Sequence, residues 1–166
     1  MEKFIIINGP MGVGKTVTGK LLCEKIGRAA FIDGDWCLDI HPFIGNKETK
    51  SMAIDNIVYM AKNYNLCSEC DIIVLSWIMS ENTIEKILHG LKNVELKIYC
   101  ITLICDKDSL IERWKNDKIV EWRNDEWLNQ SLKSIEDFSK RNVKNIIDNS
   151  KMSIDDVIYK IMELIA

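Results

Sequence analysis

The sequence lacks the features that mark membrane, secreted and nucleic-acid-binding proteins. None of its apolar runs approaches the roughly 18 residues that a membrane-spanning helix requires. The apolar segment at residues 4–7 is too short for a signal peptide, and no small-residue cleavage pattern follows it. The formal net charge is −3, so the chain has no surplus of positive charge for nucleic acid. We therefore expect a cytoplasmic protein that binds neither membranes nor nucleic acids.

Linkers, repeats and low-complexity tracts are also missing, and the 166 residues contain only two prolines. A chain of this length with 47% hydrophobic residues has enough apolar surface for one packed core. We expect a single domain over residues 1–166, present as a monomer or homodimer. The six cysteines are expected to stay reduced in the cytoplasm. Cys67 and Cys70 have no second pair spaced for zinc, so the prediction for them is ordinary thiols.

Short apolar runs alternate along the chain with longer segments of helical periodicity. The apolar runs predict five strands, at residues 4–8, 29–33, 71–77, 96–104 and 144–148. The periodic segments predict helices at residues 15–26, 49–64, 81–91, 106–114, 128–138 and from 153 onward. Strands that are apolar on both faces and alternate with helices are typical of a parallel sheet covered on both sides. The predicted fold class is therefore α/β.

One glycine-rich motif gives the clearest functional signal. Residues 9–16 match the pattern GxxxxGK[ST] and lie between a predicted strand and a predicted helix. The glycines let the backbone wrap around phosphate oxygens, the lysine neutralises the β- and γ-phosphates, and the threonine offers a hydroxyl to Mg²⁺. The motif predicts an ATP and Mg²⁺ site with eight residues: Gly9, Met11, Gly12, Val13, Gly14, Lys15, Thr16 and Val17. Lys15 is also a predicted catalytic residue, and Thr16 a predicted metal ligand.

Three large classes of P-loop protein do not fit the rest of the chain. A GTPase needs a base-reading Asn-Lys-x-Asp, and residues 46–49 read Asn-Lys-Glu-Thr instead. An ABC ATPase needs a larger domain and a Leu-Ser-Gly-Gly signature, which the sequence lacks. AAA-type motors carry an acidic pair after an apolar strand, whereas the strand at residues 71–77 ends in Ser76-Trp77. The remaining class is a small phosphotransferase.

Two carboxylates follow the second predicted strand. Asp33 and Asp35 flank Gly34, at the sheet edge where ligands bind in doubly wound folds. There, one acid can hold Mg²⁺ through water while the other accepts a proton from an attacking hydroxyl. An alternative is a plain turn, because Asp-Gly is common turn chemistry. The phosphate loop one βα unit upstream favours the functional interpretation.

With these motifs, the whole chain resembles the small P-loop kinases, which include shikimate kinase, gluconate kinase, adenylate-kinase-like enzymes and chloramphenicol phosphotransferase. Residues 31–37, followed by His41-Pro42-Phe43, look most similar to predicted bacterial nucleotide kinases. The resemblance implies a three-layer α/β/α fold with a five-stranded parallel sheet in the order 2-3-1-4-5 and a short lid. It also implies that Asp33 serves the metal and Asp35 the acceptor.

The resemblance further implies a lid over the polar stretch at residues 115–127. Arg123 within it would clamp the transferring phosphate as a catalytic residue, and Arg113 just before it would contact the nucleotide. The alternative is a solvated loop with two ordinary arginines.

Two tryptophans are expected at the carboxyl edge of the sheet. Trp36 follows the acids and Trp77 follows the third strand, which suggests a flat or ring-shaped acceptor. With Asp33 and Asp35, they form the predicted substrate set. Packing within the core is the alternative for each ring.

The expected activity is ATP- and Mg²⁺-dependent phosphoryl transfer to a small-molecule acceptor, in the manner of a nucleotide kinase. One alternative is a kinase of a hydroxyl-bearing metabolite or antibiotic. Another is a nucleotide-binding regulator with little turnover.

Overall fold

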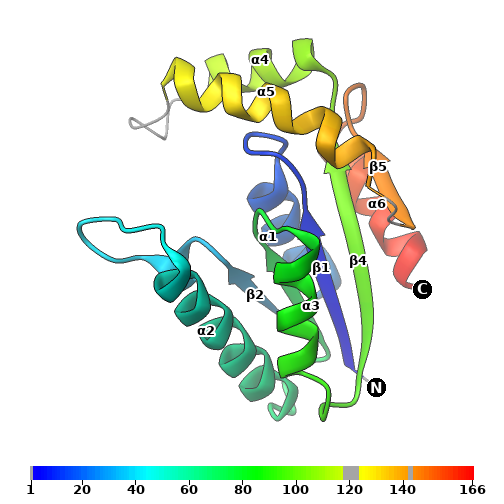
Figure 1. Ribbon diagram of the computed structural model, residues 1–166. Helices are drawn as coiled ribbons and strands as arrows, with labels where there is room; N and C mark the ends of the chain where they lie inside the picture. The colour runs from blue at the N-terminus through cyan, green and yellow to red at the C-terminus, as the bar shows by residue number, and fades with distance from the viewer. Residues whose placement is uncertain (1, 118–123, 142–143) are drawn as a thin grey trace.

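The computed structural model describes residues 2–117, 124–141 and 144–166 (Figure 1). Strands and helices alternate along these residues, with one short 3₁₀ helix, η1, after the second strand. The elements are β1 Glu2–Asn8, α1 Lys15–Ile26, β2 Ala29–Asp33, η1 Trp36–Leu38, α2 Lys47–Asn65, β3 Ile72–Ser76, α3 Glu81–Gly90, β4 Leu96–Ile104, α4 Lys107–Asn116, α5 Asp125–Ser139, β5 Asn145–Asp148 and α6 Ile154–Ile165.

The five strands form one parallel sheet in the order β2-β3-β1-β4-β5, which confirms the predicted topology. β1 lies in the middle and is buried from Phe4 to Asn8. Successive side chains of β1 enter opposite cores: Phe4 and Ile6 face one cluster, and Ile5 and Ile7 face the other. A central strand must be apolar on both faces for this reason, and the sequence shows it as an unbroken hydrophobic run.

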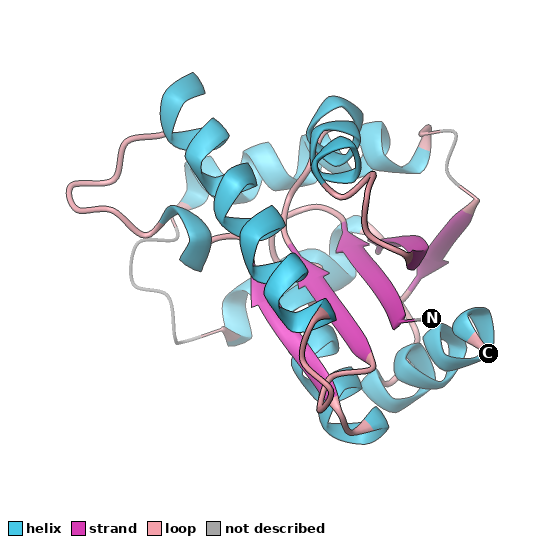
Figure 2. Ribbon diagram, turned by 90° about the horizontal axis from the view of Figure 1, so that it is seen from below, coloured by secondary structure: helices cyan, strands magenta, loops and turns pink. Residues whose placement is uncertain are grey.

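Helices cover both faces of the sheet, which confirms the three-layer architecture (Figure 2). α2 and α3 supply the first core and α1 and α6 the second. α4 and α5 lie across the carboxyl ends of the strands (Figure 1). No described helix is both long and apolar enough to cross a membrane.

Side-chain caps define where α6 and α2 begin. Ser153 Oγ accepts a hydrogen bond from Asp156 N, and Asp156 Oδ2 accepts one from Ser153 N, which forms a capping box at the start of α6. α2 begins two residues earlier than predicted, because Asn46 and Thr49 form a second capping box.

Both ends of the predicted lid, residues 115–127, belong to helices in the structure. Residues 115–116 complete α4, and residues 125–127 form the first turn of α5. Asn124 caps α5 by accepting hydrogen bonds from the backbone N–H groups of Glu126 and Trp127. Arg123 and the rest of residues 118–123 lie outside the described residues, so the lid function stays a prediction.

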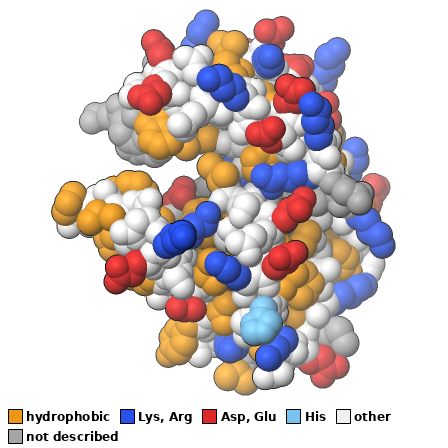
Figure 3. All heavy atoms as spheres, in the orientation of Figure 1, with side chains coloured by type: hydrophobic (Ala, Val, Ile, Leu, Met, Phe, Trp, Pro, Cys, Tyr) orange, Lys and Arg blue, Asp and Glu red, His pale blue; other side chains and the backbone are white. Residues whose placement is uncertain are grey.

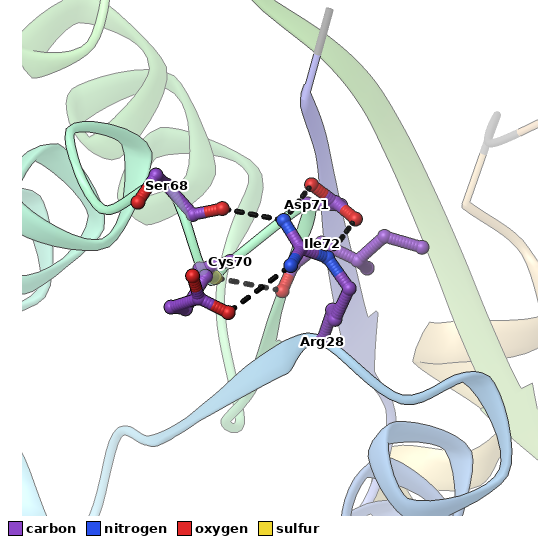
Figure 4. A network of polar contacts seen from close by, with 6 residues as sticks. Arg28, Ser68, Cys70, Asp71 and Ile72 are labelled. Carbon is purple, nitrogen blue, oxygen red and sulfur yellow. Dashed lines mark hydrogen bonds and ion pairs between the residues drawn. The ribbon is translucent and has the colours of Figure 1, made fainter.

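At the opposite, amino edge of the sheet, Arg28 joins β2 to the segment before β3 (Figure 4). Its guanidinium donates to both Asp71 oxygens, at 2.7 and 3.1 Å, and to Glu69 and the Ser68 carbonyl. Cys70 lies beside this network and is buried, whereas Cys67 is exposed. Burial raises the pKa of the nearby Cys23 thiol to about 11, as expected for an unreactive structural thiol.

Candidate active site

The phosphate loop connects the buried end of β1 to the first turn of α1. Gly9, Gly12 and Gly14 all have positive φ, at 144°, 81° and 101°, which non-glycine residues rarely adopt. At Gly9 a Cβ atom would also lie 2.3 Å from the Leu103 carbonyl oxygen, so β4 could not pack there. The loop can therefore follow this path only with glycine at these positions.

Side chains hold the loop carbonyls from outside. Ser131 of α5 donates to the Met11 carbonyl at 2.6 Å, and Asn149 Nδ2 donates to the Val13 carbonyl at 3.0 Å. Because the N–H after each carbonyl points the opposite way in a trans peptide, these bonds direct the amides of Gly12 and Gly14 toward the inside of the loop. Inward amides at a helix N-terminus form an anion site.

The two charged or polar side chains of the motif lie where phosphate and metal chemistry require them. Lys15 is buried, and its Nζ lies 2.7 Å from the Pro10 carbonyl oxygen, so the ammonium is folded over the loop. Thr16 Oγ1 lies 3.4 Å from Asp33 Oδ2. The first helical turn and the end of β2 thus meet at one point. Val17, the last predicted nucleotide contact, is 55% exposed on the same turn.

Asp33 is a half-buried carboxylate with several polar neighbours. Burial raises its pKa and the charge of Asp35 adds to this, while hydrogen bonds from Asp35 N and Thr16 and the charge of Lys20 work against it. Because burial disfavours the ionised form of Asp33 in the free protein, a bound cation would stabilise that form. Its position beside Thr16 fits Mg²⁺ held by the threonine hydroxyl and this carboxylate.

Ser76 adds a second observation in favour of a cation at this place. Its hydroxyl is buried and has no hydrogen-bond partner within the described residues. Ser76 pairs with Asp33 in the parallel register of β3 and β2. A buried hydroxyl without a partner is costly, and a metal-bound water between Ser76 and Asp33 would satisfy it. The residues present therefore fit a magnesium ion.

Asp35 is held by Trp77, which the sequence alone assigned to the acceptor. The indole Nε1–H donates to Asp35 Oδ1 at 3.0 Å, while the ring is only 7% exposed and belongs to the core. Gly34 packs against the ring so closely that a Cβ would lie 2.1 Å from Trp77 Cγ. Trp77 therefore orients Asp35. Its ring packs in the core, which is the alternative given for it in the sequence analysis. Trp36, in contrast, is 77% exposed.

Asn8, at the end of β1, is a site residue that the sequence analysis missed. Its side-chain amide donates to Met79 O and accepts from Met79 N, each at 2.9 Å, and Asn8 Oδ1 also accepts from Gly9 N. This pairing ties the phosphate loop to the segment after β3. Arg141, after α5, donates to the same Met79 carbonyl at 2.7 Å. The sequence signal that could have identified Asn8 is its position as a polar residue directly after the apolar residues 4–7.

Arg113 and Asn149 form a brace on the outer side of the loop. Arg113 Nη1 donates to Asn149 Oδ1 at 2.8 Å and to Val13 O at 3.3 Å, and Nη2 donates to Asn149 O at 2.8 Å. Asn149 is 4% exposed, and the sequence analysis gave it no role. The guanidinium edge is thus engaged in protein contacts, so Arg113 suits stacking on a base better than clamping a phosphate.

A cavity of about 490 Å³ opens beside this brace, between α4 and the segment after β5. Its polar lining includes Arg113, Ser109 and Ser150. Ser150 Oγ accepts from Asp106 N at 2.7 Å and Ser109 Oγ donates to Ser150 O at 3.2 Å, so the two walls are bonded together. A cavity with hydrogen-bonding walls next to a phosphate loop fits a nucleotide base.

We predict that Asn149→Ala destabilises the protein and weakens ATP binding together. The change removes one donor to Val13 O and the side-chain acceptor of Arg113 Nη1, while the backbone acceptor of Nη2 remains, and the loss costs about 1–3 kcal/mol for buried groups. Thermal unfolding should show a lower midpoint, by about 2–4 °C for each kcal/mol in a protein of this size. Calorimetric titration should show weaker ATP binding. Asn82→Ala, at an exposed position of α3, is the matched control. Unchanged ATP affinity in Asn149→Ala would contradict the brace.

Comparison with known proteins places this geometry in a family. A family model described as an AAA domain matches residues 5–129, well over half of the chain. The chain belongs to the AAA-domain family. This member lacks the acidic pair of AAA motors, because β3 ends at Ser76 and Trp77 follows it. Shikimate kinase of Psychrobacter cryohalolentis is 46% identical over 35 residues, which are 21% of this chain and only 18% of that enzyme.

Solved structures share the fold of this AAA-domain protein over nearly its whole length. The tunicamycin resistance protein of Deinococcus radiodurans has a TM-score of 0.73 and 18% identity, over 100% of this chain and 96% of its own. A gluconokinase from Sinorhizobium meliloti has a TM-score of 0.67 and 14% identity, over 95% and 88%. At these identities the likeness concerns the fold alone.

Proposed function

We propose that the protein transfers the γ-phosphoryl group of ATP, with Mg²⁺, to a small-molecule acceptor. The observation that carries the proposal is the meeting of Lys15, the Thr16–Asp33 pair and the oriented Asp35 at one edge of the sheet. A regulator that only binds nucleotide would need the loop and the metal ligands. It would not need a further carboxylate held beside them by a buried tryptophan.

Each residue of this constellation has a distinct task. The loop amides and Lys15 bind the β- and γ-phosphates, and Thr16 and Asp33 hold the metal. A magnesium ion held by Thr16 and Asp33 would supply positive charge that offsets the charge of the phosphates. Asp35, kept in place by Trp77, orients the acceptor hydroxyl and accepts its proton. Arg123 would add positive charge when the lid covers the phosphates, as the sequence predicts.

The acceptor class separates two versions of this function. A nucleotide acceptor offers an ionised phosphate that needs no base, whereas a metabolite or antibiotic offers a hydroxyl that does. The relatives named above include a shikimate kinase and a gluconokinase, both named for hydroxyl-bearing acceptors. The orientation of Asp35 by Trp77 favours the hydroxyl version, because a phosphate acceptor gains nothing from a positioned base.

ADP release from ATP tests the proposal directly. We expect little ADP from the protein with ATP and Mg²⁺ alone, and a marked rise with one class of acceptor. The panel should include nucleoside monophosphates, nucleosides, shikimate and gluconate. Binding of ATP without a rise for any acceptor would instead support the regulator.

A further inference from the structure

A second cavity lies beside β2, the strand at one edge of the sheet. Its volume is about 410 Å³, within the range of about 300–1,000 Å³ that small-molecule sites occupy. It is bounded by α1, β2, η1 and α2, so it is separate from the cavity beside Arg113. The side chains around it differ in kind from those of the phosphate loop.

Aromatic and sulfur-containing side chains form most of the wall. The rings are Phe31 of β2, Trp36 of η1 and Tyr59 of α2. Trp36 and Tyr59 are 77% and 69% exposed, although these ring types gain most from being covered. The base of the cavity contains Cys37 and Met60, whose sulfur atoms lie 4.0 Å apart. Such a surface binds a flat, apolar ring by stacking and dispersion.

The charged groups at and beside this cavity leave no surplus of positive charge for an anion. Among the described residues of the lining, Lys20 is the one cation and Asp33 the one anion, and the positive charge of Lys20 acts on Asp33. Asp35 lies two residues away and adds further negative charge nearby. An anionic ligand would meet repulsion from these acids and would have only a lysine that already serves Asp33. A ligand without net charge fits best.

Asn56 supplies a polar group on the α2 wall. Its Nδ2 donates to the Cys37 carbonyl at 3.0 Å, which fixes the side chain. Its Oδ1 has no hydrogen-bond partner within the described residues and can accept a bond from a ligand. A ring with an N–H or O–H group would satisfy it.

Asp33 connects this cavity to the chemistry. It lines the cavity and also lies 3.4 Å from Thr16, at the predicted metal. We propose that the cavity holds the ring of the phosphoryl acceptor, and that the acceptor is an uncharged alcohol with a planar ring, of the nucleoside type rather than the nucleotide type. The inference rests on the proposed kinase function and specifies its substrate.

The transfer step then balances without a further reactant. The acceptor hydroxyl oxygen forms a bond to the γ-phosphorus, and the bond from that phosphorus to the β,γ-bridging oxygen breaks. The hydroxyl proton passes to the Asp35 carboxylate and from there to solvent. The products are a phosphate monoester and ADP.

Matched pairs of probes test the acceptor class. Uridine and UMP, thymidine and dTMP, and adenosine and AMP differ only in the phosphate. ADP release should rise with at least one nucleoside and not with its monophosphate, shikimate or gluconate. Transfer only to monophosphates, shikimate or gluconate would keep the kinase function and overturn this inference. Absence of transfer to any probe would overturn both.

Two variants test the place of binding. Trp36→Ala and Tyr59→Ala should each raise the KM for the active nucleoside about 5- to 100-fold, the loss expected for one stacking partner. Both side chains are exposed, so the fold should survive. Tyr159→Ala, on α6, removes a comparably exposed ring that is not part of the described cavity lining and should leave the KM unchanged. An unchanged KM in both cavity variants would overturn the assignment even if nucleosides are phosphorylated.

Discussion

Lys15→Met should lower the rate of ADP formation by about 10²- to 10³-fold, the loss expected when one preorganised electrostatic partner is removed. The ammonium is buried in the loop and lies 2.7 Å from Pro10 O, so its positive charge is held where the phosphates are expected to bind. Charge that develops on the transferring phosphate would lose its nearest cation. Steady-state kinetics with the identified acceptor measures the effect.

The methionine variant is chosen because it keeps the length and apolar stem of the lysine. Pro10 O still loses a hydrogen bond, so thermal unfolding and circular dichroism must show that the variant is folded. Lys25→Met, in the last turn of the same helix, removes an equal charge from an exposed ion pair with Asp155. It should retain the wild-type rate. A folded Lys15→Met protein with the wild-type rate would refute the role of this lysine.

Asp35→Asn should lower the rate by about 10²-fold or more while ATP affinity changes only a few-fold. The asparagine retains an oxygen that can accept the Trp77 indole N–H, so the packing around Gly34 is preserved. What is lost is the basicity that accepts the hydroxyl proton. Rate and ATP affinity should be measured on the same preparation, because only their separation identifies a base.

The same variant distinguishes the two acceptor classes. If the acceptor is a hydroxyl, the rate falls as stated, whereas an already ionised phosphate acceptor would leave the rate nearly unchanged and alter only KM. Asp55→Asn, on the exposed side of α2, is the charge-matched control and should behave as the wild type. Full activity of Asp35→Asn toward a hydroxyl acceptor would mean that the nucleophile is activated by another group.

Phosphate-loop chemistry and the α/β class were predictable because both depend on local or periodic patterns, whereas the strand order was implied by the resemblance to small P-loop kinases. The glycines act through the backbone and the lysine through its side-chain ammonium, all within the eight consecutive positions 9–16. Continuous apolar runs such as residues 4–7 identify buried parallel strands, since only strands covered on both faces need them. The acids at Asp33 and Asp35 could be placed at the carboxyl edge once the strand before them was recognised.

The roles of single side chains near the loop depended on contacts between distant segments. Nothing in the sequence near Trp77 shows that its ring packs under Gly34 or that its N–H reaches Asp35, 42 positions away. Asn149 meets Val13 across 136 positions, and Ser131 meets Met11 across 120. Hydrogen bonds of this kind have no periodic signature, because any polar residue at the right point in space can make them.

The sequence by itself thus determined the α/β class and the nucleotide loop of this protein, and its resemblance to small P-loop kinases implied the strand order. Only the tertiary structure decided that Trp77 orients an acid while Trp36 lines a cavity, and that Arg113 braces the loop through Asn149. The physical reason is that hydrophobic periodicity records which face of an element is buried. It does not record which partner from another element completes a polar group, since that depends on how the layers pack.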